Sequence, residues 1–203
     1  MIFKPLSLAL IVAGGLAAST ITNPSFETPV LGAGNFQYNP TGATWTFTGD
    51  SGIAANGSAF NFAPAPNGVQ VAFLQVFGST TSSFSETISS VSVGDMISFS
   101  DAARPGFTAN SFNVLYNGSV IGSFTPASTT WTTASVTIPV GAPSSGTLAF
   151  VSTGATGGDA DVGIDNLTST PASTTPEPGT FALLLIPAVA GLMLARKKAA
   201  SRG

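Results

Sequence analysis

The 203-residue chain is predicted to fold mainly as an all-β sandwich, set between two terminal segments of different composition. Three observations predict this fold class. Residues 20–170 are rich in Ser, Thr, Gly, Phe and Val, and they are poor in strong helix formers. No segment in this range keeps a 3.6-residue hydrophobic period for three turns. Short alternating runs recur instead between Gly, Pro and Asn, and around ten such runs are typical of a β-sandwich.

Each expected strand is one of these alternating runs. Phe112, Val114 and Tyr116 alternate with other residues, and Asn117-Gly118 then predicts a type I′ hairpin turn, because both positions accept positive φ. The expected strands are Thr22–Phe26, Thr44–Thr48, Gly57–Phe62, Gln70–Phe77, Ser83–Ile88, Met96–Asp101, Ser111–Tyr116, Ser119–Phe124, Thr132–Ile138, Thr147–Ser152 and Val162–Thr168.

The first 19 residues have the three parts of a secretory signal peptide. Lys4 supplies the positive charge, residues 6–16 form an apolar run, and small residues at positions 17–19 offer a cleavage site. Two adjacent glycines in the apolar run argue against a buried N-terminal helix. The sequence therefore predicts a signal peptide, residues 1–19, and export of the rest of the chain.

The C-terminal segment has the composition of a membrane helix with a basic end. Residues 179–195 are uncharged, and as a helix they would span roughly 26 Å, at the short end of what crosses a bilayer. Arg196, Lys197 and Lys198 follow as a membrane stop, which is expected on the cytoplasmic side. The sequence predicts a single transmembrane helix with a basic tail, residues 179–203.

A Pro-Glu-Pro triplet, Pro176, Glu177 and Pro178, directly precedes this helix. The triplet, the apolar run and the basic end together resemble the PEP-CTERM sorting signal. The resemblance implies an exosortase-like membrane protease as partner, with cleavage near the triplet. It also implies a precursor inserted in the inner membrane and then a protein at the cell surface or in the extracellular matrix, in an exopolysaccharide or biofilm setting. A plain C-terminal anchor that is never cut is the alternative.

Between the two ends lie an ectodomain, residues 20–168, and a linker rich in Pro, Ser and Thr, residues 169–178. Arg104 is the single basic residue of this region, against nine carboxylates, so the region carries a formal charge of −8. Nucleic acid is therefore excluded as a partner, whereas calcium and neutral polysaccharide are favoured. The chain has no Cys and no His, which excludes the usual zinc sites and Ser-His-Asp chemistry.

Three segments of the ectodomain are landmarks of a second resemblance: Asn23-Pro24-Ser25-Phe26-Glu27, Trp45-Thr46-Phe47-x-Gly49 and Ile164-Asp165-Asn166-Leu167. The ectodomain resembles the galactose-binding-like jelly rolls, a superfamily that includes many carbohydrate-binding modules. The resemblance implies a jelly-roll sandwich, and it implies a structural Ca²⁺ shared by the first and last strands. Glu27 and Asp165 are the carboxylates that match this metal site.

The sequence around Asp165 adds a local argument. Ile164 and Leu167 are both expected to face inward, although strict alternation would place them on opposite faces. A β-bulge at Asp165-Asn166 reconciles them and aims the carboxylate inward. The nearby run Asp159–Asp165 fails as an EF-hand, because its glycine stands at the fifth position and no glutamate closes the loop. We interpret Asp159 and Asp161 as parts of a solvated acidic loop.

A glycan site needs an exposed aromatic ring beside hydrogen-bonding groups. Tyr38, in a Gly/Asn/Pro-rich loop, is the ring expected to be exposed, and Arg104 is the cation expected beside it. An ion pair between Arg104 and Asp101 is the structural alternative. Trp45 is expected in the core. The remaining candidates are Trp131 and Tyr116 as rings, with Gln70, Gln75 and Asn113 as polar partners.

The predicted function is that of an exported, non-catalytic surface or matrix protein, with glycan binding as an additional property. A dedicated carbohydrate-binding module is the alternative. A simple membrane-anchored structural protein and a glycan-acting enzyme are further candidates. A glycan-acting enzyme would need two converging carboxylates, and the spacing of Asp50, Glu86, Asp95 and Asp101 gives no such pair. The sequence analysis therefore predicts no enzymatic activity.

Overall fold

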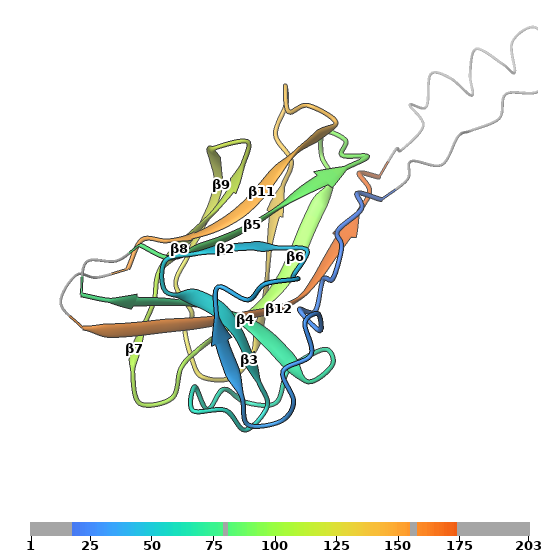
Figure 1. The fold of residues 1–203 in the computed structure, drawn as a ribbon. Coiled ribbons are helices and arrows are strands. Elements are labelled where there is room, and N and C mark those ends of the chain that lie inside the picture. Colours follow the sequence, from blue (N-terminus) through green and yellow to red (C-terminus); the bar gives the residue numbers. More distant parts are fainter. Residues whose placement is uncertain (1–17, 79–80, 155–157, 174–203) are drawn as a thin grey trace, which may run out of the picture. The chain divides into compact units, whose positions relative to one another are not determined.

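A computed structural model describes residues 18–78, 81–154 and 158–173. In these residues, strands form two sheets and no helix is present, so the predicted all-β sandwich is confirmed (Figure 1). The strands are β1 (Phe36–Tyr38), β2 (Thr46–Thr48), β3 (Ser51–Ala55), β4 (Gln70–Phe77), β5 (Ser83–Ser89), β6 (Met96–Ala103), β7 (Thr108–Ala109), β8 (Phe112–Tyr116), β9 (Ser119–Phe124), β10 (Thr132–Thr137), β11 (Ser145–Ser152) and β12 (Asp159–Thr170).

Several predictions fall outside the described part of the chain. They concern the signal peptide up to residue 17, the triplet at 176–178 and the helix and basic tail at 179–203. Within the described ranges, no helix is long and apolar enough to cross a membrane. These terminal predictions therefore stay predictions.

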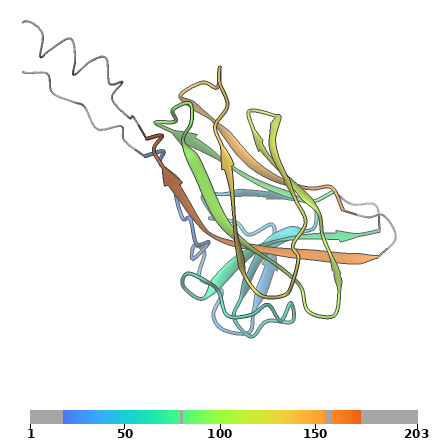
Figure 2. The ribbon, with the colours of Figure 1, turned by 180° about the vertical axis from the view of Figure 1, so that it is seen from behind.

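The seven-stranded sheet has the order β1-β3-β4-β12-β6-β10, and β7 pairs with β12 in parallel. The five-stranded sheet has the order β2-β5-β11-β8-β9. Figure 2 shows the two sheets from behind, with the long strand β12 crossing the seven-stranded sheet. β12 lies between β4 and β6 and is antiparallel to both, so residues at its start and its end belong to opposite ends of this sheet.

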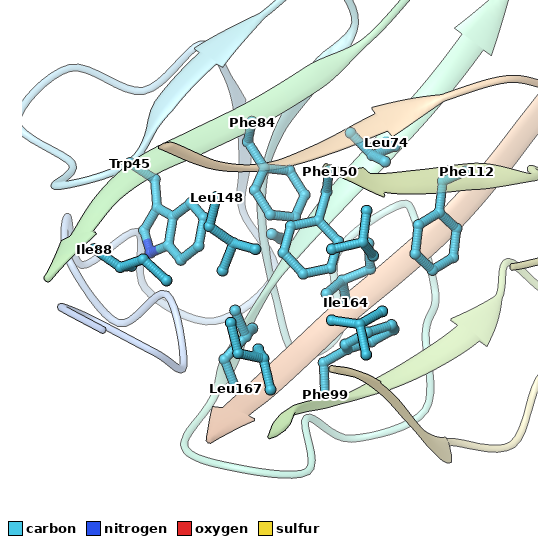
Figure 3. Packing of buried hydrophobic residues seen from close by; sticks show 14 of the residues in the cluster. Trp45, Leu74, Phe84, Ile88, Phe99, Phe112, Leu148, Phe150, Ile164 and Leu167 are labelled. Atoms are coloured by element: carbon cyan, nitrogen blue, oxygen red, sulfur yellow. The ribbon is translucent and has the colours of Figure 1, made fainter. Parts of the chain in front are cut away.

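Aromatic rings from both sheets fill the space between them (Figure 3). Phe84 and Phe150 stack with ring centroids 5.0 Å apart, and Phe99 meets Phe150 edge-on at 5.2 Å. Trp45 is buried among them, as predicted. Period-two alternation directs these side chains inward, and burying each large ring contributes roughly 2–3 kcal/mol. The core therefore explains why the chain needs no disulfide to fold.

Most expected strands are confirmed, but two are wrong. Residues 22–26 form a turn rather than a strand, because Asn23 and Phe26 have positive φ and the Phe26 N–H donates to the Asn23 carbonyl. Residues 57–62 belong to the connection after β3. The sequence analysis missed β1, β3 and β7, which are short or rich in small residues.

The predicted hairpin turn at Asn117-Gly118 is confirmed. Their φ angles are +48° and +79°, and the turn places Tyr116 opposite Ser119 in the β8–β9 pair. Both central residues thus have the left-handed backbone that a type I′ turn requires.

The connection between β3 and β4, residues 56–69, packs against the outer face of the seven-stranded sheet. It contributes Phe60 to a second apolar cluster with Phe73, while Phe62 and Trp131 pack at the border of this cluster. Gly163 makes room for this layer, because a Cβ atom there would overlap the Trp131 ring. One face of this sheet therefore carries a layer of aromatic side chains outside the main core.

The two ends of the described domain meet at one buried carboxylate, Asp95. Its Oδ2 accepts hydrogen bonds from the Ser19 hydroxyl at 3.1 Å and the Ser92 N–H at 2.8 Å. Its Oδ1 accepts from the Ala172 N–H at 3.0 Å. The described chain therefore starts and stops beside the end of β12, away from Asp159 at the start of this strand (Figure 1).

Candidate functional site

Four aromatic side chains of the described residues are exposed on or beside the seven-stranded sheet. They are Phe36 and Tyr38 on β1, Phe77 at the end of β4 and Phe107 just before β7. Phe36 and Tyr38 meet edge-on with centroids 5.8 Å apart. Tyr38 also packs on Phe73 at 5.2 Å, across Gly52 of the strand between them.

Strand pairing places two acidic groups beside the C-terminal end of β4. In the pair β4–β12, Asp159 lies opposite Phe77 and Asp161 lies opposite Gln75. Directly opposite residues in an antiparallel pair share a face. Gln75, Phe77, Asp159 and Asp161 therefore project from the outer face of the sheet. With Tyr38, Phe36, Arg104 and Phe107 they form what we call the aromatic-acidic site.

A chain of polar contacts joins Tyr38 to Arg104, the two residues predicted for glycan binding. The Tyr38 hydroxyl donates to Gln75 Oε1, and Gln75 Nε2 donates to Asp159 Oδ1 at 2.6 Å. Asp159 Oδ2 lies 3.6 Å from Arg104 Nη1. The structure therefore brings both predicted residues into one network, through two intermediates on β4 and β12.

Arg104 is held on several sides. Its Nη1 donates to Asp161 Oδ2 at 3.1 Å, its Nη2 donates to the Ala59 carbonyl at 3.0 Å, and its guanidinium lies 3.7 Å from the Phe107 ring centroid.

The alternative prediction, an ion pair between Arg104 and Asp101, is wrong. That carboxylate accepts from the Thr132 hydroxyl at 2.7 Å, and strand alternation directs it to the inner side of β6.

Asp161 is fully buried, so the interpretation of this segment as a solvated acidic loop is wrong. Burial raises the pKa of Asp161 to about 7; the hydrogen bond from Arg104 opposes this shift and the charge of Asp159 adds to it. Its Oδ1 has no hydrogen-bond partner among the described residues. Burial also raises the pKa of Tyr38, and the charges of Asp161, Asp50 and Asp159 raise it further.

The predicted bulge near Asp165 is confirmed. The β12–β6 register shifts between Asp165 and Thr168, Asn166 has a φ of +55°, and Ile164 and Leu167 are both buried in the core. The Asp165 carboxylate is fully buried, and its Oδ2 accepts from the Asn67 N–H at 2.9 Å. The β3–β4 connection covers this carboxylate on the outer face of the sheet, so the prediction that the bulge aims it inward is wrong.

Glu27 approaches the same connection from the N-terminal segment. Its Oε1 accepts from the N–H groups of Val69 and Gln70, each at 2.8 Å. Burial raises the pKa of Asp165 to about 7, the hydrogen bonds from Asn67 and Asn166 oppose this shift, and the charge of Glu27 adds to it. The two carboxylates predicted for calcium are thus close enough to interact electrostatically. We call Glu27 and Asp165 the carboxylate pair.

One further observation favours a cation bound at the carboxylate pair. Asp165 Oδ1 is buried and has no hydrogen-bond partner, and an uncompensated buried oxygen of this kind is costly without a cation or a proton. Among the described residues, however, no three acidic side chains gather around one point. Backbone carbonyls would have to complete a Ca²⁺ shell here, as they commonly do.

The other ring candidates do not form a platform. Tyr116 is buried and donates to the Pro143 carbonyl at 2.8 Å, while Trp131 is half-buried and donates to the Ala63 carbonyl at 3.1 Å.

A separate groove of about 450 Å³ lies along the five-stranded sheet. It has no aromatic side chain and is lined by Thr22, Thr44, Thr46, Ser85, Glu86, Thr87 and Thr147.

Five members of the site were not predicted from the sequence: Phe36, Phe77, Phe107, Asp159 and Asp161. Period-two alternation in β4 could have placed Gln75 and Phe77 on one face. No sequence pattern places Phe107 against the Arg104 guanidinium, because this contact depends on the loop between β6 and β7.

No family model matches the chain, and no curated protein sequence matches it. A cyclase from Fischerella sp. TAU matches with a TM-score of 0.57 at 18% identity, over 78% of this chain and 99% of that chain. The K3 cleaved adhesin domain of Lys-gingipain from Porphyromonas gingivalis W83 matches with a TM-score of 0.53 at 13% identity, over 76% and 100%. The chain shares the fold of these two proteins.

A carbohydrate-binding module, TmCBM61 in complex with β-1,4-galactotriose, is also similar, with a TM-score of 0.48 at 17% identity over 74% of this chain and 96% of that chain. The structural neighbours therefore include carbohydrate-binding modules and adhesin domains. The likeness to the cyclase and to the adhesin domain shows the fold alone and not a ligand.

The prediction that the chain lacks enzymatic activity needs correction. Two of the similar structures are of the Fischerella cyclase, one of them in complex with 4-(1H-indol-3-yl)butan-2-one. An enzyme therefore uses this fold, and the prediction of no enzymatic activity, which was based on missing residue types and on carboxylate spacing, is wrong.

Proposed function

We propose that the chain is an exported surface or matrix protein whose sandwich domain binds glycans at the aromatic-acidic site. One observation carries this proposal: the exposed ring of Tyr38 is joined through Gln75 to Asp159, which lies opposite the exposed Phe77 and 3.6 Å from Arg104. The C–H face of a sugar ring stacks on an aromatic ring, and its hydroxyl groups bond to amides and carboxylates. The site offers both kinds of group side by side.

The site is also held in place before a ligand arrives. Tyr38 packs on Phe73, and Gln75 is fixed by bonds to both Tyr38 and Asp159. Arg104 is fixed by Asp161 and by the ring of Phe107. Side chains that are already ordered lose little conformational entropy on binding, and this favours affinity at a small site.

The proposal includes a structural Ca²⁺ at the carboxylate pair. Glu27 and Asp165 would hold the ion together with backbone carbonyl oxygens of their own segments. When bound, the ion would supply the positive charge that these two carboxylates otherwise lack. It would thereby join the N-terminal segment to the bulge of β12.

The terminal segments support a route to the cell surface. In this proposal the signal peptide directs export, the helix at 179–195 inserts transiently, and an exosortase-like protease cuts near Pro176–Pro178. Intact mass of the protein from a host with such a protease tests this route. A product that ends near residue 178 supports sorting. A product that retains Arg196–Gly203 contradicts it and leaves a plain anchor.

Glycan binding is tested by screening the sandwich domain against a glycan array and titrating the best ligand by calorimetry. Tyr38→Ala should lower the affinity about tenfold, because one stacked ring contributes on the order of 1–1.5 kcal/mol and about 1.4 kcal/mol corresponds to a factor of ten. Val120→Ala is the matched control, since Val120 is an exposed apolar residue on β9 in the other sheet. Glycan binding that survives Tyr38→Ala, or a complete lack of binding, would contradict the proposal.

A further inference from the structure

We infer that the aromatic-acidic site selects glycans with free amino groups, such as polymers of glucosamine, over neutral and acidic glycans. This inference rests on the proposed glycan binding and names its ligand class. Four features carry it: the balance of charge in the site, the screening of Arg104, the partial exposure of Asp159 and the rings beside it.

The charge of the site is negative. Asp50, Asp159 and Asp161 all lie close enough to Tyr38 to affect its ionisation, whereas Arg104 is the single basic residue there. The excess of carboxylates persists even when Asp161 holds a proton. In the whole described range, residues 18–173, Arg104 stands against eight carboxylates. The domain therefore attracts cations over a longer range as well.

The positive charge of Arg104 is turned away from a ligand. Its side chain is 12% exposed, because Phe60 and Phe107 lie 4.6 Å and 3.7 Å from the guanidinium and its Nη atoms bond to Asp161 and the Ala59 carbonyl. The neighbouring Asp159 side chain is 25% exposed. An arriving ligand therefore meets a carboxylate rather than a guanidinium.

A second observation concerns the carboxylate beneath this surface. Asp161 is fully buried, and its Oδ1 has no hydrogen-bond partner among the described residues. An unpartnered buried oxygen is costly unless a proton or a nearby positive charge compensates it, and no described residue donates a hydrogen bond to this atom. Arg104 compensates only the other oxygen, Oδ2. A ligand ammonium at Asp159 would add positive charge next to this buried group.

The exposed rings favour the same ligand. Phe77 is 67% exposed and lies opposite Asp159 in the β4–β12 pair, while Tyr38 reaches Asp159 through Gln75. An ammonium group is attracted both to a carboxylate and to the face of an aromatic ring. A neutral sugar would gain the stacking alone, and a uronate or a sulfated sugar would be repelled.

The test compares three oligosaccharides of equal length by calorimetry at about pH 5.5, where sugar amines are protonated. They are a glucosamine oligomer, its N-acetylated form and a neutral glucan. Wild-type protein should bind the glucosamine oligomer at least tenfold more tightly than the other two, and added salt should weaken this binding. Asp159→Asn should reduce the preference about tenfold, whereas Asp101→Asn, a buried carboxylate outside the site, should leave it unchanged.

The experiment distinguishes a failure of the amino-sugar inference from a failure of the proposed glycan binding. Equal affinity for all three oligomers, with loss on Tyr38→Ala, would overturn the amino-sugar inference and leave glycan binding intact. Tighter binding of a uronate oligomer, or of oligolysine in the absence of any sugar binding, would also overturn it. Failure of every glycan to bind would overturn the proposed function and this inference together.

Discussion

Two aspartates on β12, Asp161 and Asp165, define the chemistry of this domain at the scale of single residues. Both are fully buried, both have one oxygen without a partner, and burial raises the pKa of each to about 7. They differ in their surroundings, because Asp161 contacts Arg104 whereas Asp165 lies near Glu27. The charge of Asp161 is therefore partly compensated by Arg104, whereas Asp165 has no basic side chain beside it among the hydrogen-bond and ion-pair partners of the described residues.

The stability of the domain should depend on pH through Asp161. Its pKa in the folded state is about 7, above the ordinary value of 3.8, so the folded state binds this proton more tightly than the unfolded chain. The resulting stabilisation is complete below about pH 4 and is lost as pH rises through 7. The free energy of unfolding should fall across this window, by up to about 1.4 kcal/mol per pH unit for this group.

Urea denaturation from pH 4.5 to 7.5, with calcium removed, checks this dependence. Asp161→Asn cannot titrate, so its free energy of unfolding should fall less steeply than that of the wild type. Identical slopes in the two proteins would show that Asp161 does not carry the effect.

Calcium should stabilise the domain through Asp165. At a Ca²⁺ concentration of about 100 times Kd, binding to the folded state alone adds about 2.7 kcal/mol, which should appear as a rise in melting temperature of several degrees. Asp165→Asn should abolish this rise. Asp161→Asn is the control, because that aspartate is equally buried on the same strand but lies at the other site. A wild-type melting temperature that changes neither when Ca²⁺ is added nor when EDTA is added would refute the metal proposal.

At the scale of elements, the β3–β4 connection links the two sites. Its C-terminal part donates the Asn67 and Val69 N–H groups to Asp165 and Glu27, and its N-terminal part accepts from Arg104 at the Ala59 carbonyl. One loop therefore touches both the carboxylate pair and the aromatic-acidic site. Its conformation is expected to matter for calcium and for glycan alike.

Two glycines in this connection offer a matched test of that expectation. Gly57 and Gly68 both have a φ of +77°, but a Cβ at Gly68 would overlap the Glu27 carboxylate, whereas a Cβ at Gly57 meets nothing within 4 Å. Gly57→Ala should cost only the backbone strain, about 1–2 kcal/mol. Gly68→Ala should cost at least about 1 kcal/mol more and should weaken the stabilisation by Ca²⁺. Denaturation curves with equal losses for both variants would argue against a role of Glu27 in holding this loop.

The elements also show what the sequence could predict. Alternating side chains identified β5, β8 and β11 correctly, because local periodicity determines which face of a strand is buried. The Asn117-Gly118 turn also located the β8–β9 pair. The segment 22–26 has a similar pattern but bends, since Trp45 Nε1 and tertiary contacts engage its backbone carbonyls. Tertiary packing overrides local propensity there.

The candidate site was predicted less completely than the fold, for a physical reason. Tyr38 and Arg104 could be proposed from residue type alone. Their connection through Gln75 and Asp159 depends on the register of three strands that are distant in the sequence. Composition also suggested that Asp161 is solvated, because it gives no information about which face of β12 the loops cover.

At the scale of the whole molecule, β12 separates the candidate site from the chain ends. Asp159 stands at the first residue of this strand and Thr170 at the last, roughly 35 Å apart for an extended strand. Asp95 holds both described ends near Thr170, through Ser19 and Ala172. A domain attached at this end would present the aromatic-acidic site at its opposite end, which suits a surface protein that binds glycans.

The central claim is the location of the glycan site, and amide chemical shifts during a titration with a bound oligosaccharide test it most directly. The account predicts that shifts concentrate at Tyr38, Gln75–Phe77, Asp159–Asp161 and Arg104–Phe107, and that they vanish in Tyr38→Ala. Shifts concentrated instead along the hydroxyl-lined groove of the five-stranded sheet, around Thr46, Ser85 and Thr147, would contradict the account.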